Sequence, residues 1–171
     1  RGKAGPRRQT PTPPPKAGAN SVLEISGSWS SPGREWPAPT ERVRETLLGG
    51  VNVVELCWNI AGPTMGRVLT DLGASTIKVE PRGVGEPGRM IVPFPDRTPD
   101  INKSYTFHDN NRGKLGITID MKNPKGPDLA IKLAEWADVM LENFTAGTME
   151  RLNIPYETLS TANAKLVLGS L

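Results

Sequence analysis

The sequence contains very little cysteine and histidine, with one residue of each, Cys57 and His108. One cysteine allows no internal disulfide, and the two residues are too few for a zinc site, so we expect no bound metal. Sparse cysteine also fits a reducing compartment, and we predict a cytoplasmic location. Cys57 ends an apolar run, which favours a small core residue over a nucleophile. His108, next to Asp109, is expected to lie exposed in a loop.

Long hydrophobic runs are absent as well. No apolar segment approaches the roughly 20 residues that a membrane-spanning helix needs. The N-terminal residues also lack the apolar centre of a secretory signal. We therefore expect no association with a membrane.

Charge is unevenly distributed along the chain. The first sixteen residues carry five basic side chains, five prolines and no acidic residue, whereas acidic residues exceed basic ones by two in the remainder. No aromatic residues interleave with these basic ones to stack bases, so nucleic-acid binding is not expected. We interpret residues 1–45, rich in Pro, Gly and Ser, as a linker or tail before a domain over 46–171. Trp29 and Trp36 are expected to pin part of this linker to a folded surface, and a helix over Thr40–Leu48 to lead into the domain.

From residue 51 onward, short apolar runs alternate with segments of helical periodicity. Val51–Cys57 has the length and β-branched content of a strand, and Pro63–Leu72 has apolar residues at helical spacing. Ser75–Glu80 is then a second strand, parallel to the first because the two are joined by a helical crossover. The same patterns predict strands at Ile117–Asp120, Val139–Glu142 and Lys165–Ser170, a helical turn over Thr148–Leu152, a helix over Pro155–Asn163, and a helix capped by Asn123 and starting at Pro124, with Leu129, Ile131, Leu133, Ala134 and Trp136 inside.

Strands that alternate with helices and are apolar on both faces predict an α/β fold, with a parallel sheet covered by helices on both sides. The long segment 81–104, rich in Gly and Pro, is expected to cover a site. In such sheets ligands bind beyond the carboxyl ends of the strands. Five cations are predicted to lie in loops near the strand ends, where together they would suit a phosphate-bearing ligand although each alone is typical of a surface: Arg82, Arg89, Arg112, Lys114 and Arg151.

The turn Trp58–Pro63 opens a helix whose free N–H groups favour an anion. Gly62 and Gly66 are four residues apart, so the G-x-G-x-x-G fingerprint is absent and a nicotinamide cofactor is not favoured, even though Glu80 ends the second strand. The alternative to an anion site is that Gly62 and Pro63 only form a tight turn. Asn143-Phe144 suits a nucleobase, or else a turn amide beside a buried ring. The sequence offers no catalytic pair, and we expect the following to be surface or capping carboxylates: Glu55, Asp71 and Asp120.

Four blocks of residues, in this order and spacing, resemble the family III CoA-transferases (CaiB/BaiF) over residues 50–171. Each block is short, and their joint order makes the resemblance specific. They are Val54-Glu-Leu with Ala61-Gly-Pro63; Asp71-Leu-Gly-Ala74 with Ile77-Lys-Val-Glu-Pro81; Asn111-Arg-Gly-Lys114 with Ile119-Asp-Met-Lys122; and Ala137-Asp-Val-Met-Leu-Glu-Asn-Phe144 with Gly147-Thr-Met-Glu-Arg151.

The resemblance implies a Rossmann-like domain that binds coenzyme A and helps to move it from an acyl-CoA to a carboxylic acid. It implies a dimer or, given the linker, a tandem protein whose two domains pair. In the family an aspartate is the nucleophile, and the resemblance puts it beyond Leu171, so no catalytic residue is predicted in this chain. By position, the implied contacts are Asn59, Ile60 and Ala61 along the CoA, Arg82 and Lys114 at its phosphates, Asn143 and Phe144 at the adenosine end, and Arg151 as a further charge.

Two alternatives remain open at this point. One is an α-methylacyl-CoA racemase or isomerase, which would need an acid–base pair for proton transfer at the α-carbon. The other is a CoA-binding domain without catalytic activity.

Overall fold

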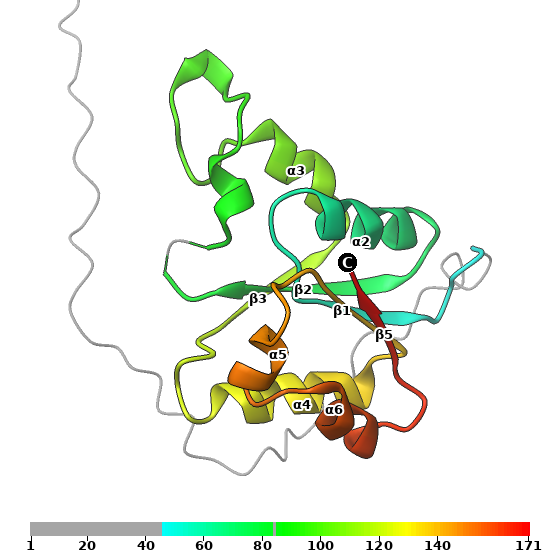
Figure 1. Cartoon of the computed structure of the whole chain (residues 1–171). Coiled ribbons are helices and arrows are strands. Elements are labelled where there is room, and N and C mark those ends of the chain that lie inside the picture. Colours follow the sequence, from blue (N-terminus) through cyan, green and yellow to red (C-terminus); the bar gives the residue numbers. More distant parts are fainter. Residues whose placement is uncertain (1–45, 84) are drawn as a thin grey trace, which may run out of the picture. The chain divides into compact units, whose positions relative to one another are not determined.

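The computed structural model describes residues 46–83 and 85–171, which form a three-layer α/β structure (Figure 1). The α/β class and the parallel sheet predicted from the sequence are confirmed. In this part of the chain five parallel strands make one sheet, in the order β3-β2-β1-β4-β5: β1 (Asn52–Glu55), β2 (Ser75–Pro81), β3 (Leu115–Ile119), β4 (Val139–Glu142) and β5 (Val167–Ser170).

Helices cover both faces of the sheet (Figure 1). Two lie on one face, α2 (Ala61–Asp71) and α3 (Tyr105–Asn111). The other face carries α4 (Gly126–Trp136), α5 (Thr148–Arg151) and α6 (Tyr156–Ala162). The segment between β2 and α3 contains two short 3₁₀ turns, η1 (Pro87–Met90) and η2 (Pro95–Arg97). Among the described residues, no helix has the length and apolar content needed to cross a membrane.

Several predicted boundaries differ from the structure. The strand Val139–Glu142 has the predicted bounds, but the helix expected from Pro124 starts at Gly126. Asn123 does not cap it, because its Oδ1 accepts from the Lys125 N–H at 3.0 Å in the preceding turn. Leu129, expected inside, is 39% exposed. The segment up to residue 45, with Trp29, Trp36 and most of the helix expected over 40–48, lies outside the described residues.

Helix α3 was not predicted, and His108 lies in it rather than in a loop. Only Phe107 and Asn110 of this helix are buried, so it has no apolar stripe that periodicity could detect. Its start is fixed by a cap, since the Ser104 hydroxyl accepts from the Phe107 N–H at 3.1 Å. His108 is exposed, as expected, with Nε2 at 2.7 Å from the Asn102 carbonyl oxygen.

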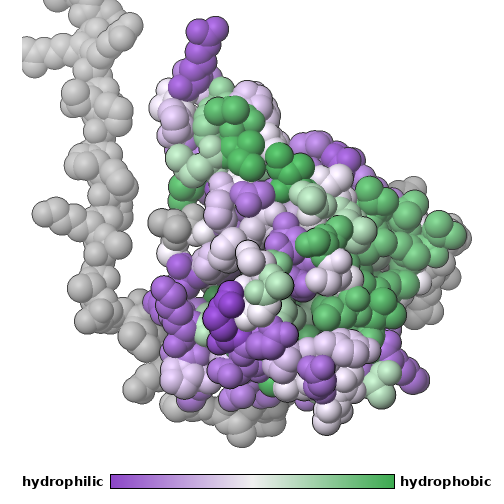
Figure 2. All heavy atoms as spheres, viewed as in Figure 1, coloured by the Kyte–Doolittle hydropathy of each residue, from purple (hydrophilic) through white to green (hydrophobic). Residues whose placement is uncertain are grey.

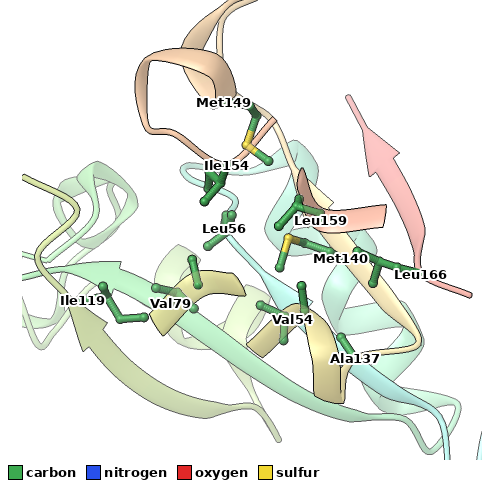
Figure 3. Packing of buried hydrophobic residues seen from close by; sticks show 12 residues of the cluster. Val54, Leu56, Val79, Ile119, Ala137, Met140, Met149, Ile154, Leu159 and Leu166 are labelled. Carbon is green, nitrogen blue, oxygen red and sulfur yellow. The ribbon is translucent and has the colours of Figure 1, made fainter. Parts of the chain in front are cut away.

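The larger hydrophobic core lies between the sheet and the helices α4 to α6 (Figure 3). Val54 and Met140, on neighbouring strands, are fully buried there together with Ala130 and Ala134 of α4. These two alanines let the helix approach the sheet closely. A smaller cluster on the opposite face contains Val53, because successive residues of a strand point to opposite faces.

Helix α2 packs on the sheet through small residues. Gly62, Pro63 and Gly66 are buried, and a Cβ atom added to Gly62 would lie 2.3 Å from the Cβ of Cys57. The apolar residues whose spacing predicts this helix lie mostly on its outer side, with Met65, Val68 and Leu72 41%, 46% and 38% exposed. Figure 2 shows hydrophobic side chains gathered on this side of the molecule. The periodic residues therefore identify α2 but do not mark its buried face.

Candidate functional site

A cavity of about 700 Å³ lies at the carboxyl ends of four adjacent strands, β3, β2, β1 and β4. This volume falls within the roughly 300–1,000 Å³ that is usual for small-molecule sites. The chain reverses its winding direction between β1 and β4, which is where open α/β sheets bind ligands. The lining residues are Leu56, Trp58 and Asn59; Val79, Glu80, Pro81 and Arg82; Ile119, Asp120, Met121 and Lys122; and Asn143, Phe144, Thr145, Thr148 and Leu152.

The loop from β1 to α2 forms one wall of this cavity, and Asn143 holds it in place. The Asn143 Oδ1 accepts from the Trp58 N–H at 2.8 Å, and its Nδ2 donates to the Trp58 carbonyl at 2.9 Å. The Trp58 ring meets the Phe144 ring edge to face, with 5.6 Å between centroids. Both polar groups of the Asn143 amide are thus bonded to the protein main chain.

Asn59, the next residue in this loop, has a left-handed backbone with φ of 64°. Non-glycine residues adopt this conformation uncommonly, and asparagine more readily than most. Its N–H donates to the Glu86 Oε2 at 2.8 Å, and the Glu86 side chain is fully buried. Sequence patterns did not single out Glu86, because it lies in a Gly- and Pro-rich segment without periodicity.

Phe144 is held at the cavity by the end of β4. The buried carboxylate of Glu142 accepts from the Phe144 N–H at 2.7 Å through Oε2 and bonds to the Ser170 hydroxyl through Oε1. Phe144 itself is partly buried and lines the cavity. The ring therefore presents an aromatic surface at a fixed place.

Of the five cations predicted near the strand ends, Arg82 lines the cavity. A second exposed cation, Lys122, lines it too. Lys122 follows β3 by three residues, so the rule that found Arg82 after β2 could also have found it. Asp120, expected at the surface, is exposed at the same wall, where its Oδ1 accepts from the Lys122 N–H at 3.0 Å.

Arg89 is engaged by Glu80 rather than directed to the cavity. Its Nε and Nη2 each lie 2.6 Å from a Glu80 oxygen, and its guanidinium stacks 3.9 Å from the centre of the Phe107 ring. Burial by itself would raise the pKa of Glu80, but the bonds from Arg89 and from the Glu86 N–H outweigh it, so this pKa lies below its usual value. Glu80 is thus ionised and neutralised by Arg89.

The other predicted residues Ile60, Ala61, Arg112 and Arg151 do not line the cavity. Ile60 and Ala61 are exposed at the start of α2, and no side chain caps the N–H groups there. Arg151 is exposed and donates to the hydroxyl of Thr148, a cavity residue, at 2.6 Å. Arg112 pairs at the surface with Asp71, which has the exposed position expected of it, and with Asp109.

Lys114 lies beneath α2, with its side chain 1% exposed. Its Nζ donates to the Glu55 Oε2 at 2.6 Å, to the Pro63 carbonyl at 2.8 Å and to the Asn111 Oδ1 at 3.1 Å. Burial lowers the pKa of Lys114 below its usual value, although Glu55 acts in the opposite direction. Since three acceptors already take its three protons, this position gives no support to a direct phosphate contact.

Glu55 was expected at the surface or in a cap, and this expectation is wrong. Its carboxylate is fully buried between two lysines, with Oε1 at 3.0 Å from the Lys78 Nζ and Oε2 at 2.6 Å from the Lys114 Nζ. Gly66 of α2 makes room for it, because a Cβ there would lie 1.8 Å from Oε2. A sequence pattern cannot reveal this pairing, since Lys78 and Lys114 follow Glu55 by 23 and 59 residues.

Cys57 is a core residue, as predicted. It is fully buried, and burial is the main cause that raises the pKa of its thiol far above the usual range. A thiol that stays protonated is a poor nucleophile. In residues 46–83 and 85–171 no three His, Cys, Asp or Glu side chains come together as a metal site.

Comparisons with known proteins agree with this architecture. A probable fatty acyl-CoA transferase of Mycobacterium tuberculosis, Rv3272, is 41% identical over 125 residues, which cover 72% of this chain and 31% of the relative. A succinate–glutarate CoA-transferase of Agrobacterium fabrum is 38% identical over 130 residues, covering 75% of this chain and 32% of that protein. The chain thus spans about a third of the length of the curated relatives that it matches.

Solved structures give the same result. A CaiB/BaiF family protein from Brucella suis matches with a TM-score of 0.66 and 39% identity, over 73% of this chain and 33% of that one. The crystal structure of Rv3272 matches with a TM-score of 0.64 and 38% identity, again over 73% and 33%. The family model described as CoA-transferase family III matches residues 48–171. This chain therefore belongs to CoA-transferase family III.

Proposed function

We propose that the protein transfers coenzyme A from an acyl-CoA to a carboxylic acid, and that residues 46–171 provide the part of the site that holds the CoA. The observation that carries this proposal is the cavity at the carboxyl ends of β1 to β4, in a chain of this family. It combines two exposed cations, Arg82 and Lys122, with the aromatic rings of Trp58 and Phe144.

These groups suit the chemistry of CoA. Guanidinium and ammonium groups bind phosphates by charge-assisted hydrogen bonds, so we assign Arg82 and Lys122 to the phosphates. The Phe144 ring offers an apolar face for the adenine, and we assign it to the adenosine end. Because the Asn143 amide is bonded to Trp58, we assign it the role of fixing the wall that the nucleotide meets.

The start of α2 supports the same assignment. Its first N–H groups have no side-chain cap, and such groups favour a negatively charged ligand. Asn59, Ile60 and Ala61 lead the chain into this helix, so we propose that CoA passes along them. Arg151 bonds to the cavity residue Thr148, and we propose that it adds positive charge at the rim.

The chemical step requires a nucleophile that we propose to come from an aspartate beyond Leu171. Its carboxylate would attack the thioester carbonyl, release the CoA thiolate and form a mixed anhydride. The thiolate would attack the aspartyl carbonyl and release the acid, and the acceptor carboxylate would then take the CoA by the reverse steps. The residues described here would hold the CoA in place throughout, so that binding energy from the nucleotide positions the thioester.

A CoA exchange assay of the complete protein tests this function. The relatives suggest the substrate pairs to try, since their names include succinate–glutarate, formyl-CoA:oxalate and fatty acyl-CoA transferases. We expect isotopically labelled CoA to move from a donor acyl-CoA to at least one acceptor acid. Absence of exchange with every pair, while CoA still binds, would identify a binding domain instead. Incorporation of solvent deuterium at the α-carbon, without exchange, would identify a racemase.

A further inference from the structure

The buried carboxylate of Glu86 links the β1–α2 loop, which forms one wall of the cavity, to the segment that follows β2. Through Oε2 it accepts from the Asn59 N–H at 2.8 Å and from the Gly88 N–H at 2.7 Å. Its own main-chain N–H donates to the Glu80 Oε2 at 3.2 Å. Asn59 and Glu80 both line the cavity.

The negative charge of Glu86 is balanced from beneath the loop. Its Oε1 lies 3.4 Å from the Nζ of Lys78, whose side chain is 2% exposed. The same Nζ donates to the Glu55 Oε1 at 3.0 Å and to the Cys57 carbonyl at 2.9 Å. Lys114 completes this buried cluster on the far side of Glu55. Two carboxylates, Glu55 and Glu86, therefore face two ammonium groups, and the opposite charges of the cluster balance.

The position of Glu86 matters because the Asn59 backbone is left-handed. A residue held in this conformation needs fixed partners, since it otherwise relaxes to one of the commoner conformations. Asn143 fixes the peptide groups of Trp58 on one side, and Glu86 fixes the N–H of Asn59 on the other. Together they hold the loop from both sides at the point where it meets the cavity.

We propose that Glu86 is a positioning residue for acyl-CoA: its charged side chain holds the Asn59 peptide and so keeps the cavity wall in its binding conformation. Glu86 does not line the cavity, so it acts through Asn59 and not on the ligand. This inference rests on the proposed function, because it concerns the same cavity.

The test is the affinity of the complete protein for CoA, measured by calorimetry with wild type and Glu86→Gln. Glutamine keeps the size of the side chain but replaces the carboxylate by a neutral amide, which is a weaker acceptor for the Asn59 N–H. The ammonium group of Lys78 then faces this neutral amide instead of a carboxylate. We expect the dissociation constant to rise about tenfold, and further in Glu86→Ala. We also expect faster hydrogen exchange at the Asn59 amide in both variants.

The control is Leu166→Ala, which removes a side chain that is 4% exposed next to the start of β5, at the opposite end of the strands from the cavity. It should lower stability but leave CoA affinity and the exchange of the Asn59 amide unchanged. If Glu86→Gln binds CoA like wild type, or if Glu86→Gln and Leu166→Ala lose affinity equally, the positioning role is refuted while the proposed function stands. If wild type itself binds no CoA or acyl-CoA, the proposed function is refuted and this role with it.

Discussion

The side-chain amide of Asn143 forms two hydrogen bonds with the main chain of Trp58, at 2.8 Å and 2.9 Å, across 85 residues of sequence. This pair joins the end of β4 to the loop after β1, at the point where the sheet reverses its winding direction. It uses the donor and the acceptor of one amide, so neither aspartate nor leucine at this position would reproduce it. The wall of the cavity therefore depends on a residue that the sequence offered as a nucleobase contact or a turn amide, without indicating its pairing with Trp58.

Replacing Asn143 should affect both stability and CoA binding. Asn143→Ala leaves the Trp58 peptide groups without partners, which we expect to cost about 1–3 kcal/mol in the free energy of unfolding. Because the loop lines the cavity, the affinity for CoA should fall as well. Urea denaturation and CoA titration measure the two effects.

Asn163 provides a matched control for this prediction. It is also partly buried, and its Nδ2 donates to the carbonyls of Ala134 and Ala137, away from the cavity. Asn163→Ala should lower stability by a similar amount and leave CoA affinity unchanged. Equal loss of affinity in the two variants would show that Asn143 contributes only to stability.

Gly66 should not tolerate a side chain. A Cβ there would lie 1.8 Å from the Glu55 Oε2, so Gly66→Ala must displace either α2 or a carboxylate that is paired with two buried lysines. We expect a loss of at least about 3 kcal/mol, since breaking a buried ion pair is strongly destabilising.

The comparison is Gly116→Ala on β3, where nothing lies within 4 Å of the added Cβ. There alanine should be neutral or should stabilise by about 0.5–1 kcal/mol, because it reduces the freedom of the unfolded chain. Thermal and urea unfolding measure the stability of both variants. Equal changes in Gly66→Ala and Gly116→Ala would contradict this account.

The cavity cations should account for a salt-dependent part of CoA binding. Arg82→Ala and Lys122→Ala each remove a charge at the cavity, and we expect about a tenfold weaker affinity for CoA at low salt. The effect should shrink at 1 M salt, where the Debye length is about 3 Å. Lys132, an exposed residue of α4, serves as the control, and Lys132→Ala should bind CoA like wild type. An affinity independent of Arg82 and Lys122 would remove their assignment to phosphate.

The pair Glu80–Arg89 should give a characteristic pH dependence of stability. The pKa of Glu80 lies below its usual value of 4.5 in the folded protein, so its ionised form contributes stability that is present above this pH and is lost as the pH falls through the lowered pKa. In Arg89→Gln burial acts without the opposing ion pair, and the pKa of Glu80 should rise.

The stability difference between wild type and Arg89→Gln should therefore be largest near neutral pH. It should shrink as the pH falls, first through the raised pKa of the variant and then through the lowered pKa of the wild type. Urea unfolding at a series of pH values measures it. Arg112→Gln removes an exposed arginine that pairs at the surface, and should change stability little at any pH. A difference for Arg89→Gln that is independent of pH would contradict the prediction.

Much of the fold could be predicted from local patterns. The strands that carry the cavity contain short apolar runs, such as Val53-Val54 and Val139-Met140-Leu141, and the strand at Val139–Glu142 was predicted with its observed bounds. Helix α3 was missed because its buried residues are only Phe107 and Asn110, and its start depends on the cap from Ser104. The buried side of α2 was hidden for another reason, because glycines make that contact and carry no hydrophobic signal.

The candidate site was predicted in its location more than in its details. The rule that ligands bind beyond strand ends led to Arg82, Asn143 and Phe144, the family resemblance added Asn59, and all four line the cavity. The rule does not tell which side chains are already bonded to the protein. Lys114 belongs to a buried cluster, and this depends on distant partners that only folding brings together.

The sequence by itself determined the α/β class, the parallel sheet and the family, because apolar runs, helical periods and ordered motifs are local properties of the chain. The tertiary structure decided which charges remain available to a ligand. Arg82 and Lys122 are exposed at the cavity, whereas Arg89 and Lys114 are held by carboxylates. Electrostatic pairing depends on distances of a few ångströms between residues far apart in sequence, and those distances exist only once the sheet has formed.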